Sequence, residues 1–282
     1  MGLGPRGKIA VVGLGLMGAS LAMAIREARP DADLVGVDTD PRTLARARDR
    51  SLVNEASREL AAVRGAEVVF VAVPLNVMKD VFADLEPNAG EAIVTDLAST
   101  KVAVMEWAAE ARLELVGGHP MCGKEESGID AAEPGLYKGA AWVLTRGEPK
   151  VEEVVNAVGA IPVVMEPDRH DRLVAGVSHV AFMLSVGYVL ALAEAREWPQ
   201  MGRLAGGGYR DMSRLAAGDP DLYAAIARTN RGNVAASLDA VIASLTRLRR
   251  HLDADDPRLV ELFEEARTVR ERWKRERDAG RG

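Results

Sequence analysis

Histidine is the residue type in this chain best suited to acid–base chemistry at neutral pH. Four histidines are present, at positions 119, 170, 179 and 251, together with one cysteine, Cys122. No two histidines are four residues apart, and the sequence holds no HExxH, CxxC or GxSxG motif. These spacings predict no metal site and no serine-hydrolase nucleophile, and leave a histidine base as the leading possibility.

His119 is the best candidate for that base. It follows a predicted strand directly and lies in the segment Gly-Gly-His-Pro-Met-Cys-Gly, whose glycines let the backbone approach a ligand. A neutral histidine with an ordinary pKa of about 6.5 can accept a proton from a bound alcohol. The alternative is a loop histidine hydrogen-bonded to backbone.

His179 and Cys122 are weaker candidates. His179 lies on a predicted helix in Gly-Val-Ser-His, where it is either a second active-site histidine or a satisfied histidine between domains. Cys122 has no nearby base to activate it, so the sequence predicts a small packing residue there.

A glycine-rich turn predicts the cofactor that oxidation of an alcohol needs. An apolar run at 9–12 leads into Gly-Leu-Gly-Leu-Met-Gly at 13–18, and a helical segment follows to Arg26. This strand, turn and helix pattern binds a pyrophosphate at the helix N-terminus, where backbone N–H groups are free. The residues predicted to contact the cofactor in this turn are Gly13, Gly15, Leu16, Met17 and Gly18.

Asp38 predicts that the cofactor is NAD. It ends the next apolar run, at 34–37, twenty residues after Gly18, where a carboxylate accepts hydrogen bonds from ribose hydroxyls and repels a 2′-phosphate. Arg42 is the nearest cation, which leaves NADP as the alternative. Val73 and Pro74 end a later apolar run at the edge of the sheet where ligands bind, so they are further candidate cofactor contacts.

Composition indicates an ordinary globular protein. The 282 residues are 48% hydrophobic and 28% charged, with a net charge of −6, which argues against nucleic-acid binding. A single cysteine permits no internal disulfide and is compatible with the reducing cytoplasm. The N-terminus is too short and polar for a signal peptide, and the apolar stretch 180–193 predicts a buried helix too short to span a membrane.

Alternating apolar strands and helical segments predict an α/β fold in the first part of the chain, with a doubly wound parallel sheet. After residue 166 no strand is expected, and helices are predicted at 170–195, 221–227, 234–251 and 258–274. Gly206, Gly207 and Gly208 are expected to break helices. The predicted domains are therefore residues 1–166, which bind a dinucleotide, and residues 167–282, an apolar helical domain that forms a homodimer.

Five segments together resemble one family, the prephenate and arogenate dehydrogenases of tyrosine biosynthesis. They are the glycine turn at 13–18, Asp-Leu-Ala-Ser-Thr-Lys at 96–101, Gly-His-Pro-Met-Cys-Gly at 118–123, Val-Ser-His at 177–179 and Gly-Gly-Tyr-Arg-Asp-Met-Ser-Arg-Leu-Ala at 207–216. The resemblance implies a Rossmann-type N-terminal domain with a C-terminal all-helical dimerisation domain. The histidine loop and the arginine segment are its most specific parts.

The resemblance also implies roles for individual residues. His119 is similar to the family's catalytic hydrogen-bond acceptor, and Ser99 to the serine that shares the substrate hydroxyl with it. Arg214 is similar to the arginine that binds the substrate carboxylate, and His179 to a second active-site histidine. Ser127 and Glu125 belong to the same loop as His119. The chain departs from relatives at Ala98 and Lys124, which leaves open the choice between prephenate and arogenate.

The reaction implied is NAD-dependent oxidative decarboxylation of prephenate to 4-hydroxyphenylpyruvate, or of arogenate to tyrosine. One rival is a β-hydroxyacid dehydrogenase. Members of that family share the glycine turn but resemble one another in using a catalytic lysine on a helix of the second domain. No lysine occurs between Lys150 and Lys274, which weighs against it. The other rival is a non-catalytic NAD-binding redox sensor.

Overall fold

The computed structural model describes residue 3 and residues 7–124, 126–254 and 256–279. Glu125, expected in the substrate loop, lies outside these described residues. The chain forms two compact units, residues 1–231 and residues 232–282. The domain boundary expected between residues 166 and 167 stays a prediction; the last strand ends at Val164 and the next helix begins at Pro167.

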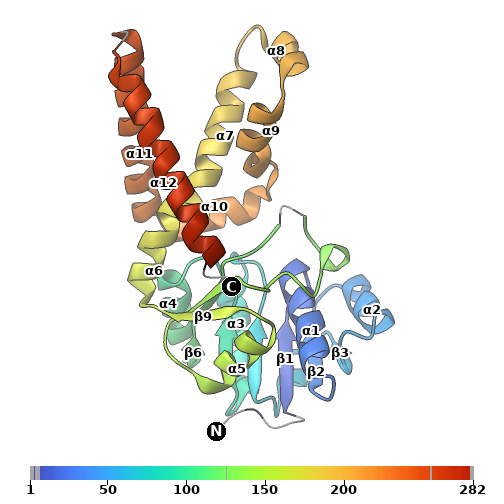
Figure 1. The fold of residues 1–282 in the computed structure, drawn as a ribbon. Helices are drawn as coiled ribbons and strands as arrows, with labels where there is room; N and C mark the ends of the chain where they lie inside the picture. Colours follow the sequence, from blue (N-terminus) through green and yellow to red (C-terminus); the bar gives the residue numbers. More distant parts are fainter. Residues whose placement is uncertain (1–2, 4–6, 125, 255, 280–282) are drawn as a thin grey trace. The chain divides into compact units, whose positions relative to one another are not determined.

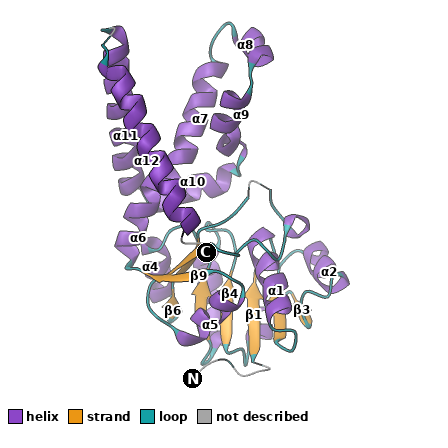
Figure 2. Ribbon diagram, viewed as in Figure 1, coloured by secondary structure: helices purple, strands orange, loops and turns teal. Residues whose placement is uncertain are grey.

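Six parallel strands form the main sheet of the first unit, in the order β3-β2-β1-β4-β5-β6 (Figures 1 and 2). They are β1 (Lys8–Val12), β2 (Asp33–Val37), β3 (Glu55–Ser57), β4 (Val68–Val71), β5 (Ile93–Asp96) and β6 (Leu115–Val116). The strand order reverses between β1 and β4, which confirms the predicted Rossmann-type, doubly wound sheet. β3 was not predicted, because its three residues carry no apolar run.

Helices cover both faces of this sheet. They are α1 (Leu16–Ala28), α2 (Pro41–Asp49), α3 (Met78–Ala89), α4 (Val102–Glu110) and α5 (Pro149–Ala157). Side chains of a strand alternate between its two faces. In β1, Ile9 and Val11 therefore pack in the core that holds α1 and α5, whereas Ala10 and Val12 pack in the core that holds α3 and α4.

A second, three-stranded sheet carries His119. Its strands are β7 (Gly118–Pro120), β8 (Ala141–Leu144) and β9 (Ile161–Val164), with β7 antiparallel and β9 parallel to β8. His119 follows strand β6 of the main sheet, as expected, but it lies in strand β7 and not in a loop. The chain leaves β6 at Gly117, whose N–H and C=O bond to Thr145 (both 2.9 Å), so the next residues pair with β8 instead.

The rest of the first unit is helical, as predicted. It comprises α6 (Pro167–Val174), a π-helical turn η3 (Ala175–His179), α7 (Val180–Ala193), α8 (Trp198–Leu204), α9 (Gly207–Ser213), the 3-10 turn η4 (Arg214–Ala217) and α10 (Pro220–Thr229). The glycine breaker was only partly correct: Gly206 precedes α9, but Gly207 and Gly208 begin it.

The helical stretch Pro167–Ala193 is, by length and composition alone, apolar enough to cross a membrane, a test that core helices of soluble proteins also pass. Its first part is buried in the first unit and carries His170 and His179. The prediction of a buried helix over 180–193 is wrong for its second half, where Val186 and Leu190 are exposed.

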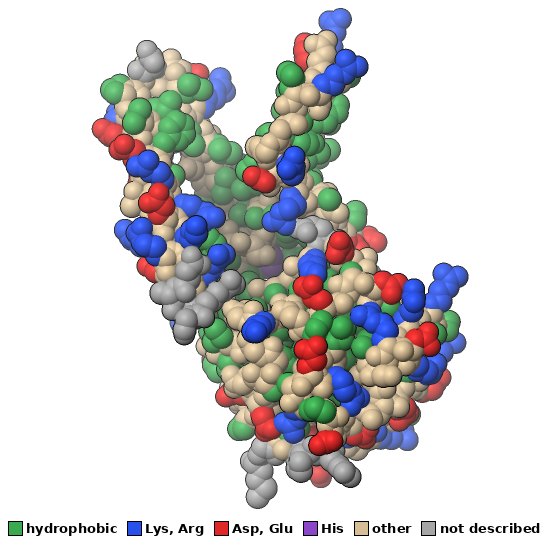
Figure 3. All heavy atoms as spheres, turned by 45° about the vertical axis from the view of Figure 1, so that its right-hand side comes forward, with side chains coloured by type: hydrophobic (Ala, Val, Ile, Leu, Met, Phe, Trp, Pro, Cys, Tyr) green, Lys and Arg blue, Asp and Glu red, His purple; other side chains and the backbone are tan. Residues whose placement is uncertain are grey.

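Two long helices, α11 (Arg231–Asp253) and α12 (Arg258–Ala279), make up the second unit. At the turn between them, Asp256 accepts hydrogen bonds from Arg258 and pairs with His251. On the face in Figure 3, hydrophobic side chains gather over the helices, whereas charges of both signs are interspersed over the sheet part. Exposed hydrophobic residues include Leu190, Leu204 and Met212 in the first unit and Leu245, Val260 and Phe263 in the second.

Candidate active site

The glycine turn leaves open space where a dinucleotide would lie. Gly13 has a φ of +90°, and a Cβ there would lie 2.6 Å from the Ala72 carbonyl oxygen at the end of β4. A Cβ on Gly18 would overlap the Gly13 carbonyl oxygen, so Gly18 lets α1 start close to β1. A Cβ on Gly15 would meet nothing within 4 Å. This open backbone fits a pyrophosphate at the N-terminus of α1, where Leu16 and Met17 supply the first N–H groups.

Asp38 and the end of β4 lie at the same edge of the sheet. The Asp38 carboxylate accepts hydrogen bonds from the backbone N–H groups of Leu14 (2.7 Å) and Asp40 (2.9 Å). Its oxygens keep further lone pairs for ribose hydroxyls. A Cβ on Gly13 would lie 3.0 Å from the backbone nitrogen of Val73, and the exposed Pro74 follows it. These residues therefore fit a dinucleotide.

His119 is the outer member of a buried row of three side chains. Its Nδ1 lies 2.8 Å from Nε2 of His170, and Nδ1 of His170 lies 2.8 Å from Oδ1 of Asp171. His119 is 8% exposed, whereas His170 and Asp171 are 0% and 1% exposed, so only His119 reaches toward solvent. The same carboxylate accepts the N–H groups of Lys101 (2.7 Å) and Val102 (3.0 Å), which ties α6 to the start of α4.

His179 lies beside this row, at the end of the π-helical turn η3. The side-chain amide nitrogen of Asn230 lies 3.1 Å from Nδ1 of His179 and donates to the Asp171 carbonyl oxygen (2.7 Å). That second bond fixes which end of the amide faces the ring. Nε2 of His179 is buried and has no hydrogen-bond partner among the described residues. π-helical turns often occur at functional sites.

The surroundings of His119 and His179 favour the neutral form of both rings. Burial lowers the pKa of His119 well below its usual value, and positive charge on His170, Lys101 or His179 lowers it further. Burial also lowers the pKa of His179 to about 4, although the Asp171 charge and the nearby Ser99 backbone oppose this. The expectation of an ordinary pKa for His119 is therefore wrong, because the ring is removed from water.

A buried ion pair fixes the backbone just before His119. The Lys101 ammonium contacts both the Asp96 carboxylate and the Gly118 carbonyl oxygen, and Asp96 accepts the Gly118 N–H (2.9 Å). A Cβ on Gly118 would overlap the Asp96 carbonyl oxygen, so only glycine fits there. Burial lowers the pKa of Lys101, and the Asp96 charge opposes that shift.

The other predicted site residues are placed less tightly. Ser99 is half-buried after β5, and its backbone lies beside His179. Arg214 is exposed at the start of η4, which is tied to α7 by a hydrogen bond from the Ala216 N–H to the Ser185 hydroxyl (2.9 Å). Ser127 is exposed in the loop after β7 and takes no part in the buried hydrogen bonds of the histidines.

Sequence reasoning missed several residues of this cluster. They are Asp96, Lys101, His170, Asp171 and Asn230. Asp96 and Lys101 are the first and last residues of the segment 96–101. A charged residue next to an apolar run can indicate a buried ion pair. His170 and Asp171 are adjacent in sequence, yet nothing near them in sequence indicates His119. The described residues hold no group of three or more histidine, cysteine, aspartate or glutamate side chains that could bind a metal.

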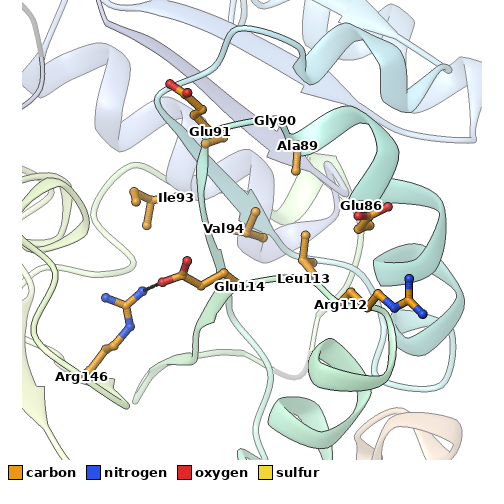
Figure 4. A pocket seen from close by; sticks show the side chains of 11 residues that line it. Glu86, Ala89, Gly90, Glu91, Ile93, Val94, Arg112, Leu113, Glu114 and Arg146 are labelled. Carbon is orange, nitrogen blue, oxygen red and sulfur yellow. Dashed lines mark hydrogen bonds and ion pairs between the residues drawn. The ribbon is translucent and has the colours of Figure 1, made fainter.

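A polar pocket lies elsewhere in the first unit (Figure 4). It is lined by residues that precede β5 and β6, including Glu91, Arg112 and Glu114, and Arg146 bonds to Glu114 across it (2.8 Å). These residues stand at the amino ends of the strands. Ligands of doubly wound sheets bind at the carboxyl ends, where the glycine turn lies, so this pocket is separate from the candidate site.

Two family models match the chain. The model for the prephenate dehydrogenase nucleotide-binding domain covers residues 21–163, and the model for the prephenate dehydrogenase dimerisation domain covers residues 166–265. A prephenate dehydrogenase from Lactococcus lactis subsp. cremoris is 27% identical over 282 aligned residues, which cover 94% of this chain and 77% of that protein.

Solved structures of two dehydrogenases are similar to this chain in sequence and in fold. The crystal structure of Synechocystis arogenate dehydrogenase is 33% identical, with a TM-score of 0.80, and the match covers 94% of this chain and 99% of that one. Prephenate dehydrogenase from A. aeolicus, in complex with hydroxyphenyl propionate and NAD+, is 26% identical with a TM-score of 0.87, covering 94% and 98% of the two chains.

Proposed function

The chain belongs to the prephenate dehydrogenase family, and on that premise we propose that it oxidatively decarboxylates prephenate to 4-hydroxyphenylpyruvate, or arogenate to tyrosine, with NAD. It is therefore an oxidoreductase of the kind that serves tyrosine biosynthesis. The observation that carries the proposal is the buried, neutral His119, the outermost member of the row that it forms with His170 and Asp171.

His119 accepts the proton of the substrate hydroxyl in this proposal. A neutral imidazole is required for that step, and its burial keeps the ring neutral at physiological pH. NAD, when bound, supplies the acceptor for the hydride that leaves the carbon bearing this hydroxyl. Loss of the ring carboxylate makes the ring aromatic, so the protein has mainly to orient the substrate and accept one proton.

Other residues bind and orient the substrate. Asn230 donates toward Nδ1 of His179, which leaves the Nε2–H of a neutral His179 to donate to a polar group of the ligand. Ser99 shares the substrate hydroxyl with His119. Arg214, exposed on η4, supplies a planar fork suited to a carboxylate. Ser127 contacts the substrate from the loop after β7. Glu125, which lies outside the described residues, is proposed as a further substrate contact.

Asp38 supports NAD over NADP, since its carboxylate stands at the end of β2 and would repel a 2′-phosphate. The A. aeolicus relative, solved with NAD+ and hydroxyphenyl propionate, supports the same cofactor and a phenol-like ligand. The single cysteine, which permits no internal disulfide, supports a cytoplasmic location.

A homodimer is part of the proposal. The match to a dimerisation domain and the exposed hydrophobic residues of α7 and of α11 and α12 support it. Light scattering at micromolar concentration should give twice the mass of one chain; the mass of a single chain would contradict it.

The direct experiment measures reduced cofactor, by absorbance, after prephenate or arogenate is added to the purified protein with NAD or NADP. We expect NADH formation with at least one substrate and a higher kcat/KM with NAD than with NADP. Inactivity with both substrates would contradict the proposal and favour the redox-sensor alternative. Because a keto or amino group alone separates the two substrates, their kcat/KM ratio measures the specificity.

A further inference from the structure

The hydrogen bonds of Asp171 determine where the protons lie in the buried row. An ionised carboxylate can only accept hydrogen bonds. The Asp171 carboxylate accepts two backbone N–H groups, from Lys101 and Val102, and faces Nδ1 of His170 at 2.8 Å. Nδ1 of His170 therefore carries the hydrogen in this contact.

The position of the hydrogen on His170 determines the position of the hydrogen on His119. A neutral His170 with its hydrogen on Nδ1 has a lone pair on Nε2. That lone pair faces Nδ1 of His119 at 2.8 Å, so Nδ1 of His119 must donate. The remaining nitrogen of His119, Nε2, is then left with a lone pair. This is the tautomer that can accept a proton from a substrate hydroxyl.

We propose that His170 and Asp171 are positioning residues, which hold His119 in the Nδ1–H tautomer and stabilise the positive charge that its ring gains. The proposal deepens the proposed function and rests on it for the catalytic consequence. The tautomer itself follows from the hydrogen bonds of a neutral His170 and an ionised Asp171, whatever reaction the protein catalyses. When Nε2 of His119 takes the hydroxyl proton, the Asp171 charge acts on the new imidazolium through His170, while the O–H electron pair stays with the substrate oxygen.

A protonated His119 needs a negatively charged partner, because the charged groups around it are positive. The ionisable groups whose charge acts on His119 are His170, His179 and Lys101, none of which carries negative charge. Lys101 is paired with Asp96, so that carboxylate is already engaged. Asp171 is the remaining carboxylate in the cluster, and it reaches His119 only through His170.

His179 provides an internal contrast. The Asn230 amide nitrogen donates to its Nδ1, so a neutral His179 carries its hydrogen on Nε2. Neighbours thus set the two histidines in opposite tautomers: His119 presents an acceptor and His179 a donor. A single substrate with one hydroxyl and further acceptor atoms would match both.

Nitrogen-15 NMR of histidine-labelled protein tests the tautomers directly, without substrate. The chain has four histidines, so the spectrum is simple, and a variant of each assigns its signals. An imidazole nitrogen with a lone pair resonates far downfield of an N–H nitrogen. We expect the downfield nitrogen to be Nε2 in His119 and Nδ1 in His179. A downfield Nδ1 in His119 would overturn the proposal, whatever the activity.

Kinetics of two His170 variants test the catalytic consequence. In His170→Phe nothing accepts the His119 Nδ1–H, so we expect the Nε2–H tautomer to appear and kcat to fall about 10- to 100-fold, with little change in KM. In His170→Gln the side-chain oxygen can accept that hydrogen, so the tautomer and part of kcat should return. His251→Gln, which removes a histidine paired with an aspartate at the turn after α11, is the matched control and should keep wild-type kcat.

Three results would overturn the positioning role: wild-type kcat in His170→Phe, equal loss of kcat in both variants with an unchanged His119 tautomer, or a rise in KM alone. Thermal unfolding of each variant identifies a loss that comes from misfolding, and the wild-type spectrum and His170→Gln decide the question if His170→Phe does not fold. Failure of the proposed function is seen separately, as a wild-type protein that oxidises neither substrate while its histidine spectrum remains as expected.

Discussion

Nδ1 of His119 lies 2.8 Å from Nε2 of His170, although the two residues are 51 positions apart and belong to a strand and a helix. The contact joins the second sheet to α6, and therefore the sheet part of the chain to its helical part within the first unit. The base proposed for catalysis is thus oriented by the helix that follows the last strand.

The low pKa of His119 predicts the pH dependence of the reaction. The base works only when neutral, and burial keeps it neutral to a lower pH than an ordinary histidine, whose pKa is about 6.5. We expect kcat to stay level as pH falls through 6.5 and to decline only at lower pH. A pH profile of kcat between 4.5 and 9 checks this. A midpoint at or above 6.5 would contradict it.

Burial of His179 predicts a loss of stability in acid. Its pKa is about 4 in the folded protein and about 6.5 when unfolded, so the unfolded state binds the proton first. The stabilisation is complete above pH 6.5 and disappears as pH falls toward 4, by about 3 kcal/mol in the free energy of unfolding. Urea unfolding at pH 7 and pH 4.5 should show a smaller loss for His179→Gln than for the wild type. Equal losses would refute this account of His179.

Asp38 predicts cofactor choice. Asp38→Asn keeps an acceptor for the ribose hydroxyls and for the Leu14 N–H but removes the charge that repels a 2′-phosphate. We expect the ratio of kcat/KM for NAD to that for NADP to fall about 10-fold or more, which is at least about 1.4 kcal/mol. The same change at the exposed Asp31 is the control. An unchanged ratio would show that the Asp38 charge does not determine the preference for NAD over NADP.

Arg214 predicts substrate affinity. Its guanidinium is proposed to bind the substrate carboxylate in the ground state, and hydrogen bonds to charged groups contribute about 1.5–3 kcal/mol. Arg214→Ala should therefore raise KM for substrate about 10- to 100-fold while retaining more of kcat. Arg203→Ala, at an exposed arginine of α8, should leave KM unchanged. A loss confined to kcat would show that Arg214 does not act by binding substrate.

Local sequence patterns predicted most of the fold. The alternation of apolar strands and helical segments was sufficient for β1, β2, β4 and β5, because each is an apolar run bounded by turns. It could not separate the two sheets. That division depends on the hydrogen bonds between Gly117 and Thr145, which are 28 residues apart. Short elements such as β3 and α9 carry too few residues to show a period.

The candidate site was predicted only in part. His119 could be found from the glycines beside it, and the cofactor turn from its spacing. His170 and Asn230 could not, because each lies 51 positions from the histidine that it contacts, His119 and His179 respectively. Asp171 contacts His170 and reaches His119 only through it. The pKa of His119 also escaped prediction, since it depends on burial by those distant elements.

The most direct test of the account is the kcat of His119→Asn with the preferred substrate and NAD. Asparagine fills similar space and can form hydrogen bonds, but it cannot take the hydroxyl proton. Loss of a general base typically lowers kcat by about 10²- to 10⁴-fold. We expect that loss, with NAD affinity measured by fluorescence titration unchanged and with His251→Asn fully active. If His119→Asn keeps near wild-type kcat and the same decline at low pH, His119 is not the proton acceptor and the account is wrong.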